Sequence, residues 1–431
     1  MLRHLKSIIY VLVCCACTAQ TVYGNNNASD KTKKRVALKK YVAQYYPYQL
    51  TYPQKKNRKS LSQFGYGLFL VQAPLYPISQ FINPHNFGSH SYSKPGRKER
   101  NGALYTCRGG FVDFAHMRCA ADWTVYFAFK ILNDTNDLQI PGDASTMHIH
   151  FNKANQLPIE DIVALAQRLA YERLTWHEIA SWYYHPPNHV IREQQSTFTP
   201  EDTYSNFLGT VVGQKVALRI LRDREKLPYE QIASEEVEKM ISVLQPVNSK
   251  RDSRHAYDIV DRCKQLKLPE TKRNKDIWYD SGIVFMDYRY CFKRNIDIGP
   301  KIEPWLVPAS ESVGCNTQIE PHVLSVPQKT TTGNPLSDFY TFTIIPEHSL
   351  FYSNKKGKQL HIPFPTFTTT TIQQVVMHVA KDMEQTLLQG FDKRDKHDPV
   401  PAFKKIKRVW FKARKPRGAE SLNQPNQQAS F

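Results

Sequence analysis

The chain lacks most of the short motifs that identify a known chemistry. It contains no glycine-rich phosphate loop, no G-x-S-x-G elbow and no internal repeat, and beyond residue 24 it contains no C-x-x-C pair. Without paired cysteines a structural zinc module is disfavoured. The spacing of residues does not test a Ser-His-Asp triad, because its members come from anywhere in a chain. The composition of the 431 residues, 41% hydrophobic and 23% charged, excludes wholesale disorder, collagen and a polytopic membrane protein.

Acidic residues are missing from one segment. Residues 31–60 hold ten Lys and Arg and no acid, and residues 393–417 hold eleven Lys and Arg against two Asp. These two flanks account for the whole net charge of +19, so the remaining chain is neutral. We predict a neutral body of one-to-two-domain size between a mobile basic arm at 25–60 and a basic, disordered tail at 392–431.

The two flanks point to a polyanionic partner. Polybasic segments gain about 1 kcal/mol per Lys or Arg near an anionic surface. We therefore expect 31–60 and 393–417 to bind anionic lipid, lipopolysaccharide or polysaccharide of a cell envelope. Residues 404–412 interleave basic and aromatic side chains, as a single-strand nucleic-acid binder does, but the predicted export argues against nucleic acid. The oligomeric state is left open.

Residues 1–24 have the pattern of an export signal. Arg3 and Lys6 precede an apolar run that is too short for a comfortable membrane span, and small residues follow it. Cleavage after Ala19 or Gly24 predicts an exported, periplasmic or envelope-associated protein. Processing at Cys17 predicts a lipoprotein, and an uncleaved anchor or a buried strand is the remaining alternative.

Few cysteines remain once that signal is removed. One or two disulfides are compatible with an oxidising compartment, and the pairing is expected among the last three cysteines. Buried free thiols are the alternative. The five cysteines are Cys107, Cys119, Cys263, Cys291 and Cys315.

Periodicity predicts an α+β fold, with a mainly helical core at 61–300 and a smaller β-rich part at 301–391 that ends in a closing helix. One strand is expected at 147–151, and β signals run from 278 to the mid-360s. Small residues Ser205, Gly209 and Gly213 recur every four positions, which predicts close approach of another helix backbone. Helices are expected at 111–132, 158–184, 199–222, 229–244, 254–266 and 371–389.

The first candidate site is Asp113 with His116. Their spacing of three places both on one helix face, where they can bind a metal ion or where the carboxylate can fix the histidine tautomer. The alternative is a helix-terminal Asp beside a hydrogen-bonded histidine. Asp122 falls on the opposite side of this helix and carries less weight.

The second candidate site is His177 with Glu178. The motif begins like the zincin sequence H-E-x-x-H, but Ser181 replaces the second histidine, so the ordinary zincin reading fails. What remains is an adjacent His–Glu pair on an apolar helix, where burial costs several kcal/mol unless the pair has partners. His185 is a poor second ligand, and exposure or a salt bridge of Glu178 is the alternative.

The third candidate site follows a helix start. Thr199, Pro200 and Asp202 are explained as helix caps. Caps do not explain Glu201, Tyr204 and Asn206, and an Asn one turn into a buried helix needs partners. Elsewhere, His148 and His150 alternate on a strand and face one side, as a metal-binding pair or as solvated side chains. We keep the second interpretation as the default for that strand.

The motifs that carry these sites resemble an exported bacterial family known only as domain of unknown function 4056. The likeness covers roughly residues 60–300 and implies export and a shared helical body, with no catalytic role. It rests on GGFVDFAH at 109–116 with AADW at 120–123, on WHEIASWY at 176–183 and on FTPEDTYSNFLG at 198–209.

Two functional hypotheses follow. In the first, the protein is a non-catalytic envelope protein whose basic flanks hold it to an anionic surface. In the second, it is a metal-dependent hydrolase in which Asp113, His116 and His177 hold one divalent ion, with zinc as the first choice. Glu178 is then the general base, and Tyr204 or Asn206 stabilises the oxyanion.

Overall fold

The computed structural model of the chain describes residues 30, 32–53, 81–93, 98–143, 145–183, 197–263, 284–287, 292–295, 299–307, 310–316, 318–346, 367–372 and 374–380. The predicted signal at 1–24 and the predicted tail at 392–431 lie outside these residues. So do Cys291 and the side chain of Cys263.

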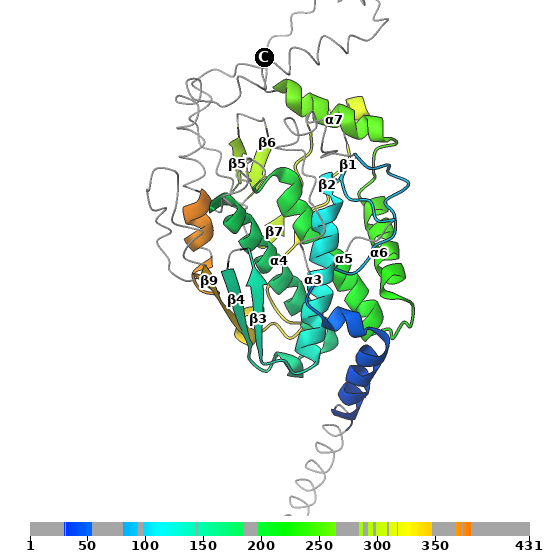
Figure 1. Ribbon diagram of the computed structural model, residues 1–431. Helices are drawn as coiled ribbons and strands as arrows, with labels where there is room; N and C mark the ends of the chain where they lie inside the picture. Colours follow the sequence, from blue (N-terminus) through cyan, green and yellow to red (C-terminus); the bar gives the residue numbers. More distant parts are fainter. Residues whose placement is uncertain are drawn as a thin grey trace, which may run out of the picture. The chain divides into compact units, whose positions relative to one another are not determined.

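The predicted α+β class is confirmed, because the core is helical and small antiparallel sheets accompany it. Figure 1 shows the arrangement of the elements. The helices are α3 (Phe114–Leu132), α4 (Ile159–Tyr183), α5 (Pro200–Leu221), α6 (Tyr229–Val243) and α7 (Lys250–Cys263). The 3-10 turns are η1 (Pro47–Leu50), η3 (Ala154–Gln156), η5 (Ser310–Val313) and η6 (Leu336–Phe339).

Within the described residues, the strands form one four-stranded sheet, in the order β10-β9-β4-β3, and three two-stranded ladders, β1-β2, β5-β6 and β7-β8. The four-stranded sheet contains β3 (Asp137–Gly142), β4 (Ser145–Phe151), β9 (Tyr340–Pro346) and β10 (Phe367–Thr368). The ladders contain β1 (Ala103–Thr106), β2 (Gly110–Asp113), β5 (Val284–Asp287), β6 (Phe292–Asn295), β7 (Lys301–Ile302) and β8 (Leu324–Ser325).

Helices α3, α4 and α5 pack against one another and form the centre of the protein (Figure 1). The small-residue stripe of α5 lies against α3, as predicted. A Cβ atom on Gly209 would lie 2.0 Å from the Met117 carbonyl oxygen, and one on Gly213 would lie 2.6 Å from that of Ala121. Because only glycine permits this approach, the polar residues near the start of α5 lie close to those near the start of α3.

The C-terminal β segment belongs to the same structural unit as the helices. Strand β9 pairs antiparallel with β4, from Ser145 opposite Pro346 to Phe151 opposite Tyr340. The hydroxyl of Tyr340 donates to Glu172 of α4 at 2.7 Å. A single unit covers residues 1–380. Residues 374–380 are helical, in agreement with the start of the predicted closing helix.

Two predictions about local structure are wrong. Residues 32–45 form a helix rather than an irregular arm. Leu38 and Val42 of this helix and Tyr46 just after it are buried, because the helix packs its apolar face on the body. Residues 110–113 form strand β2 rather than the first turn of a helix, since they pair with 103–106.

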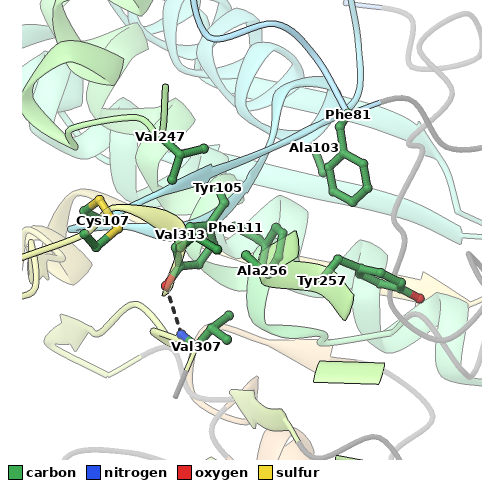
Figure 2. Close-up of a cluster of buried hydrophobic side chains, with 11 residues drawn as sticks. Phe81, Ala103, Tyr105, Cys107, Phe111, Val247, Ala256, Tyr257, Val307 and Val313 are labelled. Carbon is green, nitrogen blue, oxygen red and sulfur yellow. Dashed lines mark hydrogen bonds between the residues drawn. A yellow bond between two sulfur atoms is a disulfide. The ribbon is translucent and has the colours of Figure 1, made fainter. Parts of the chain in front are cut away.

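The expected pairing of Cys315 with Cys263 or Cys291 is also wrong. The disulfide joins Cys107 to Cys315, across 208 residues of sequence. Both cysteines belong to a buried apolar cluster that includes residues of β1 and α7, shown in Figure 2, in which the Tyr105 hydroxyl accepts a hydrogen bond from the Val307 amide. The bond therefore ties the start of the helical core to the β-rich segment. None of the helices in the described ranges is long and apolar enough to span a bilayer.

Candidate metal centre

The site forms where the starts of α3 and α5 meet the C-terminal part of α4. Asp113 is the N-cap of α3, and its Oδ1 accepts the Ala115 amide at 2.7 Å. The Asp113 amide donates to Ser205 of α5 at 2.8 Å. This hydrogen bond fixes the start of α3 on α5 and brings His116, one turn later, over the first turn of α5.

Buried carboxylates hold one edge of the His116 ring. The Nδ1 atom lies 3.3 Å from Asp113 Oδ2 and 3.2 Å from Asp202 Oδ1. The other ring nitrogen, Nε2, lies 3.8 Å from Oε1 of Glu178 on α4. A carboxylate at Nδ1 retains the proton there and leaves the lone pair of Nε2 available to a ligand.

His177 completes the group from α4. Donor atoms of His116, His177 and Glu178 all lie within 4.8 Å of one another. The Nδ1 atom of His177 lies 2.8 Å from Oδ1 of Asp143, so its Nε2 is again the nitrogen left for a ligand. His116 and Glu178 are buried, while the His177 side chain is 20% exposed and gives the site its contact with solvent.

Several buried carboxylates gather near His116. Asp113, Glu178, Glu201 and Asp202 are all buried. The pKa of Asp202 is raised well above its ordinary value, first by burial and then by the negative charges of Glu178 and Glu201, with Asp113 adding to them. We call these four residues with His116 the acid-rich cluster. An excess of buried carboxylates favours a proton or a cation in their midst.

The helix cap and the site share Asp202. Its Oδ2 accepts the amide and hydroxyl of Thr199 at 3.2 and 2.7 Å, which completes the predicted capping box. Its Oδ1 faces His116. Sequence reasoning assigned Asp202 to the cap alone and so missed its place in the site.

Asn206 belongs to the site, whereas Tyr204 bonds elsewhere. The Asn206 amide nitrogen donates to Glu178 Oε1 at 3.4 Å, and its buried oxygen accepts no hydrogen bond from the described residues. Tyr204 donates to the carbonyl oxygen of His322 at 2.9 Å, and burial raises its pKa. Its hydroxyl is thus engaged by backbone rather than by the acid-rich cluster.

Asp122 lies on the opposite side of α3 from Asp113, as predicted, and there it contacts a second buried histidine. Asp122 Oδ1 lies 2.8 Å from His90 Nε2 and accepts the Tyr229 hydroxyl at 2.6 Å. Its Oδ2 accepts the Ser93 amide at 2.9 Å. We call His90, Asp122 and Tyr229 the His90 cluster. It fastens the irregular segment at 81–93 to α3 and α6.

The strand histidines do not join either cluster. His148 and His150 lie on the solvent side of β4, and His150 Nδ1 contacts Asp137 Oδ1 at 2.8 Å in an exposed pair. Asp143 escaped prediction altogether. It lies in the turn between β3 and β4, and nothing in its local sequence indicates which helix it faces.

The fold and the site define a class: an α+β protein with a helical core that carries a buried histidine–carboxylate cluster. Residues 51–265 match the family model described as "Protein of unknown function (DUF4056)", and this part of the chain belongs to that family, for which no activity is known. The matched region includes every residue of the acid-rich cluster. No curated protein and no solved structure matches the chain.

Proposed function

We propose that the protein binds one divalent metal ion through His116, His177 and Glu178 and uses it for hydrolysis. The observation that carries the proposal is the convergence of these three side chains, which come from two helices, within 4.8 Å. The donor set of two histidines and one carboxylate suits zinc and leaves a coordination position open for water and substrate. In this set His116, from α3, takes the place of the second zincin histidine, where α4 carries Ser181 instead.

The geometry fits an ion of that kind. Ligands of a tetrahedral zinc lie at about 2.0–2.1 Å from the metal, and so roughly 3.3 Å from one another. The separation of 3.8 Å between His116 Nε2 and Glu178 Oε1 needs only a small adjustment. Asp113 and Asp202 contact His116 at Nδ1, so in this proposal they orient a ligand rather than bind the ion. The spacing of Asp113 had suggested a metal ligand, and the proposal assigns it this orienting role instead.

The protein groups have separate tasks. A bound zinc ion supplies an activated water at neutral pH. Asn206 holds Glu178 through its amide nitrogen, and its buried oxygen is an acceptor for a water or a substrate group. With Glu178 as a ligand, the lowered pKa of a zinc-bound water would itself supply the nucleophile. Asp202 lies at Nδ1 of His116, away from an ion at Nε2, so it would orient the ligand rather than act as the general base.

Metal analysis of the purified full chain tests this function. We expect about one zinc per chain by elemental analysis, loss of the zinc from His177→Ala, and retention in His150→Ala, the exposed histidine on β4. A panel of ester, amide and phosphoester substrates should then show an activity that a chelator removes and zinc restores. Zinc-free protein that cannot be loaded contradicts the metal site, and loaded protein that hydrolyses nothing contradicts the hydrolase.

A second function concerns the basic N-terminal segment. The outward face of the helix at 32–45 carries exposed Lys33, Lys34 and Lys40, and Tyr48 just beyond it is 76% exposed. We propose that this face binds an anionic surface. Since the same helix buries Leu38 and Val42, deleting it should destabilise the body, and charge reversal is the cleaner test.

The lysine test uses vesicles with and without anionic lipid at low salt. Changing Lys33, Lys34 and Lys40 to Glu should weaken vesicle binding about tenfold or more and leave the melting temperature nearly unchanged. The control changes Lys215 and Lys239, two exposed lysines of the body. Equal binding by the charge-reversed chain contradicts this surface. The second basic flank, at 393–417, and the predicted export signal lie outside the described residues, so their roles stay predictions.

A further inference from the structure

The turn between β3 and β4 reaches the metal centre through one carboxylate. Asp143 follows Gly142 and has a φ of 53°, in the left-handed region that few residues adopt. From there its two oxygens reach two residues of α4 that lie one turn apart. Oδ1 lies 2.8 Å from His177 Nδ1, and Oδ2 lies 2.5 Å from Arg173 Nη1.

Arg173 makes this arrangement rigid. Its side chain is buried, and its guanidinium lies over the ring of Trp123, 5.6 Å from the centroid. A buried guanidinium requires a carboxylate partner and fixes the direction of that carboxylate. Arg173 therefore occupies one oxygen of Asp143 and leaves the other to accept a hydrogen bond from His177 Nδ1.

The N-terminal segment covers the same turn. The hydroxyl of Tyr52 donates to the carbonyl oxygen of Pro141, and its ring packs edge-on against Trp123 with centroids 5.2 Å apart. A Cβ atom on Gly142 would lie 3.1 Å from Arg173 Nη2 and 3.3 Å from the Tyr52 hydroxyl. Tyr52, Gly142 and Arg173 thus enclose the backbone that carries Asp143.

We propose that Asp143 is the positioning residue for His177, and that Tyr52 anchors its turn. This inference rests on the proposed metal centre. A hydrogen bond from Nδ1 to Asp143 keeps Nε2 unprotonated and aims it at the ion, as Asp113 and Asp202 do for His116. The N-terminal segment, remote in sequence from the site, then supports metal affinity through Asp143.

The test compares two aspartates of one hairpin. Asp143→Asn keeps an acceptor but removes the charge, and outer partners of metal-binding histidines typically contribute about 10–100-fold in affinity. We expect zinc affinity, measured by calorimetry on the full chain, to fall by that factor. The visible absorption of the cobalt-substituted protein should also change, since the orientation of His177 changes. Asp137→Asn, which removes the same charge from the exposed pair with His150, should alter neither.

A second variant covers the case in which Asp143→Asn does not fold. Tyr52→Phe removes one hydroxyl and leaves Asp143, Arg173 and His177 intact, and it should weaken zinc binding about threefold. If the unchanged chain binds no zinc, the metal centre itself is wrong. If it binds zinc and either folded variant matches it in affinity and cobalt spectrum, the metal centre stands and the role of that residue is wrong.

Discussion

Two histidine–carboxylate clusters lie on opposite sides of α3, and they differ in charge. In the His90 cluster one carboxylate, Asp122, receives three hydrogen-bond donors, so its acceptors are satisfied by protein alone. In the acid-rich cluster the carboxylates of Asp113, Glu178 and Asp202 lie around one imidazole, and that of Glu201 acts on Asp202. Burial, and then the negative charges of its neighbours, raise the pKa of Asp202. The carboxylate of the first cluster is satisfied by protein donors, whereas the group of buried carboxylates in the second favours an added cation. Burial of a histidine beside an acid is thus no sign of function without the count of donors and acceptors.

The largest effect is expected from a substitution that breaks the His90 cluster. Asp122→Ala removes the acceptor of His90, Tyr229 and the Ser93 amide at once. We expect the free energy of unfolding, measured in urea, to fall by about 3–5 kcal/mol, because two buried donors and one half-buried donor lose their partner. The zinc bound per folded chain should not change. Loss of zinc without loss of stability would reverse the roles of the two clusters.

The second prediction removes the histidine of the acid-rich cluster. His116→Ala should reduce zinc affinity by more than about 100-fold, beyond the effect of losing an outer partner. The metal-free protein should keep its melting temperature to within a few degrees. His90→Ala is the matched control: it should lower that temperature and leave zinc affinity intact. A similar loss of zinc in both variants would show that the comparison is wrong.

The smallest effect concerns the charge of Asp202. Its raised folded-state pKa means that protonation favours the folded, metal-free chain, and this stability is lost as the pH rises through that pKa. Asp202→Asn should therefore stabilise the metal-free protein by about 1 kcal/mol at neutral pH and flatten this pH dependence, while zinc affinity falls about tenfold. Urea unfolding between pH 5 and 8 measures the first effect. If the metal-free Asp202→Asn protein is less stable than the unchanged chain at every pH, the charge of Asp202 does not destabilise the acid-rich cluster and this prediction is wrong.

Local features of the fold could be predicted from the sequence. The start of α5 follows from Thr199, Pro200 and the capping carboxylate of Asp202, since caps act within one turn. The approach of α5 to another helix follows from Gly209 and Gly213. The apolar periodicity of α4 placed its bounds within a residue of those observed.

Contacts between distant segments could not be predicted in the same way. The pattern marked Asp113, His116, His177, Glu178 and Asn206 separately, but nothing in it indicated that His116 would supply the histidine missing at Ser181. The partner of His177, Asp143, comes from a turn whose strand β3 carries weak signals. The pairing of Cys107 with Cys315 depends on the cluster that buries both. The expectation that Cys315 would pair with a cysteine nearer in sequence was therefore wrong. The helix at 32–45 was overlooked because its basic charge concealed the apolar spacing of Leu38, Val42 and Tyr46.

The most direct measurement is the location of zinc in crystals of the zinc-loaded full chain by anomalous scattering. The proposed centre predicts a peak about 2.0–2.2 Å from Nε2 of His116, Nε2 of His177 and a carboxylate oxygen of Glu178. His116 Nδ1 should still face Asp113 and Asp202. Zinc found only at the exposed His148 and His150, with the acid-rich cluster unchanged, would contradict the account.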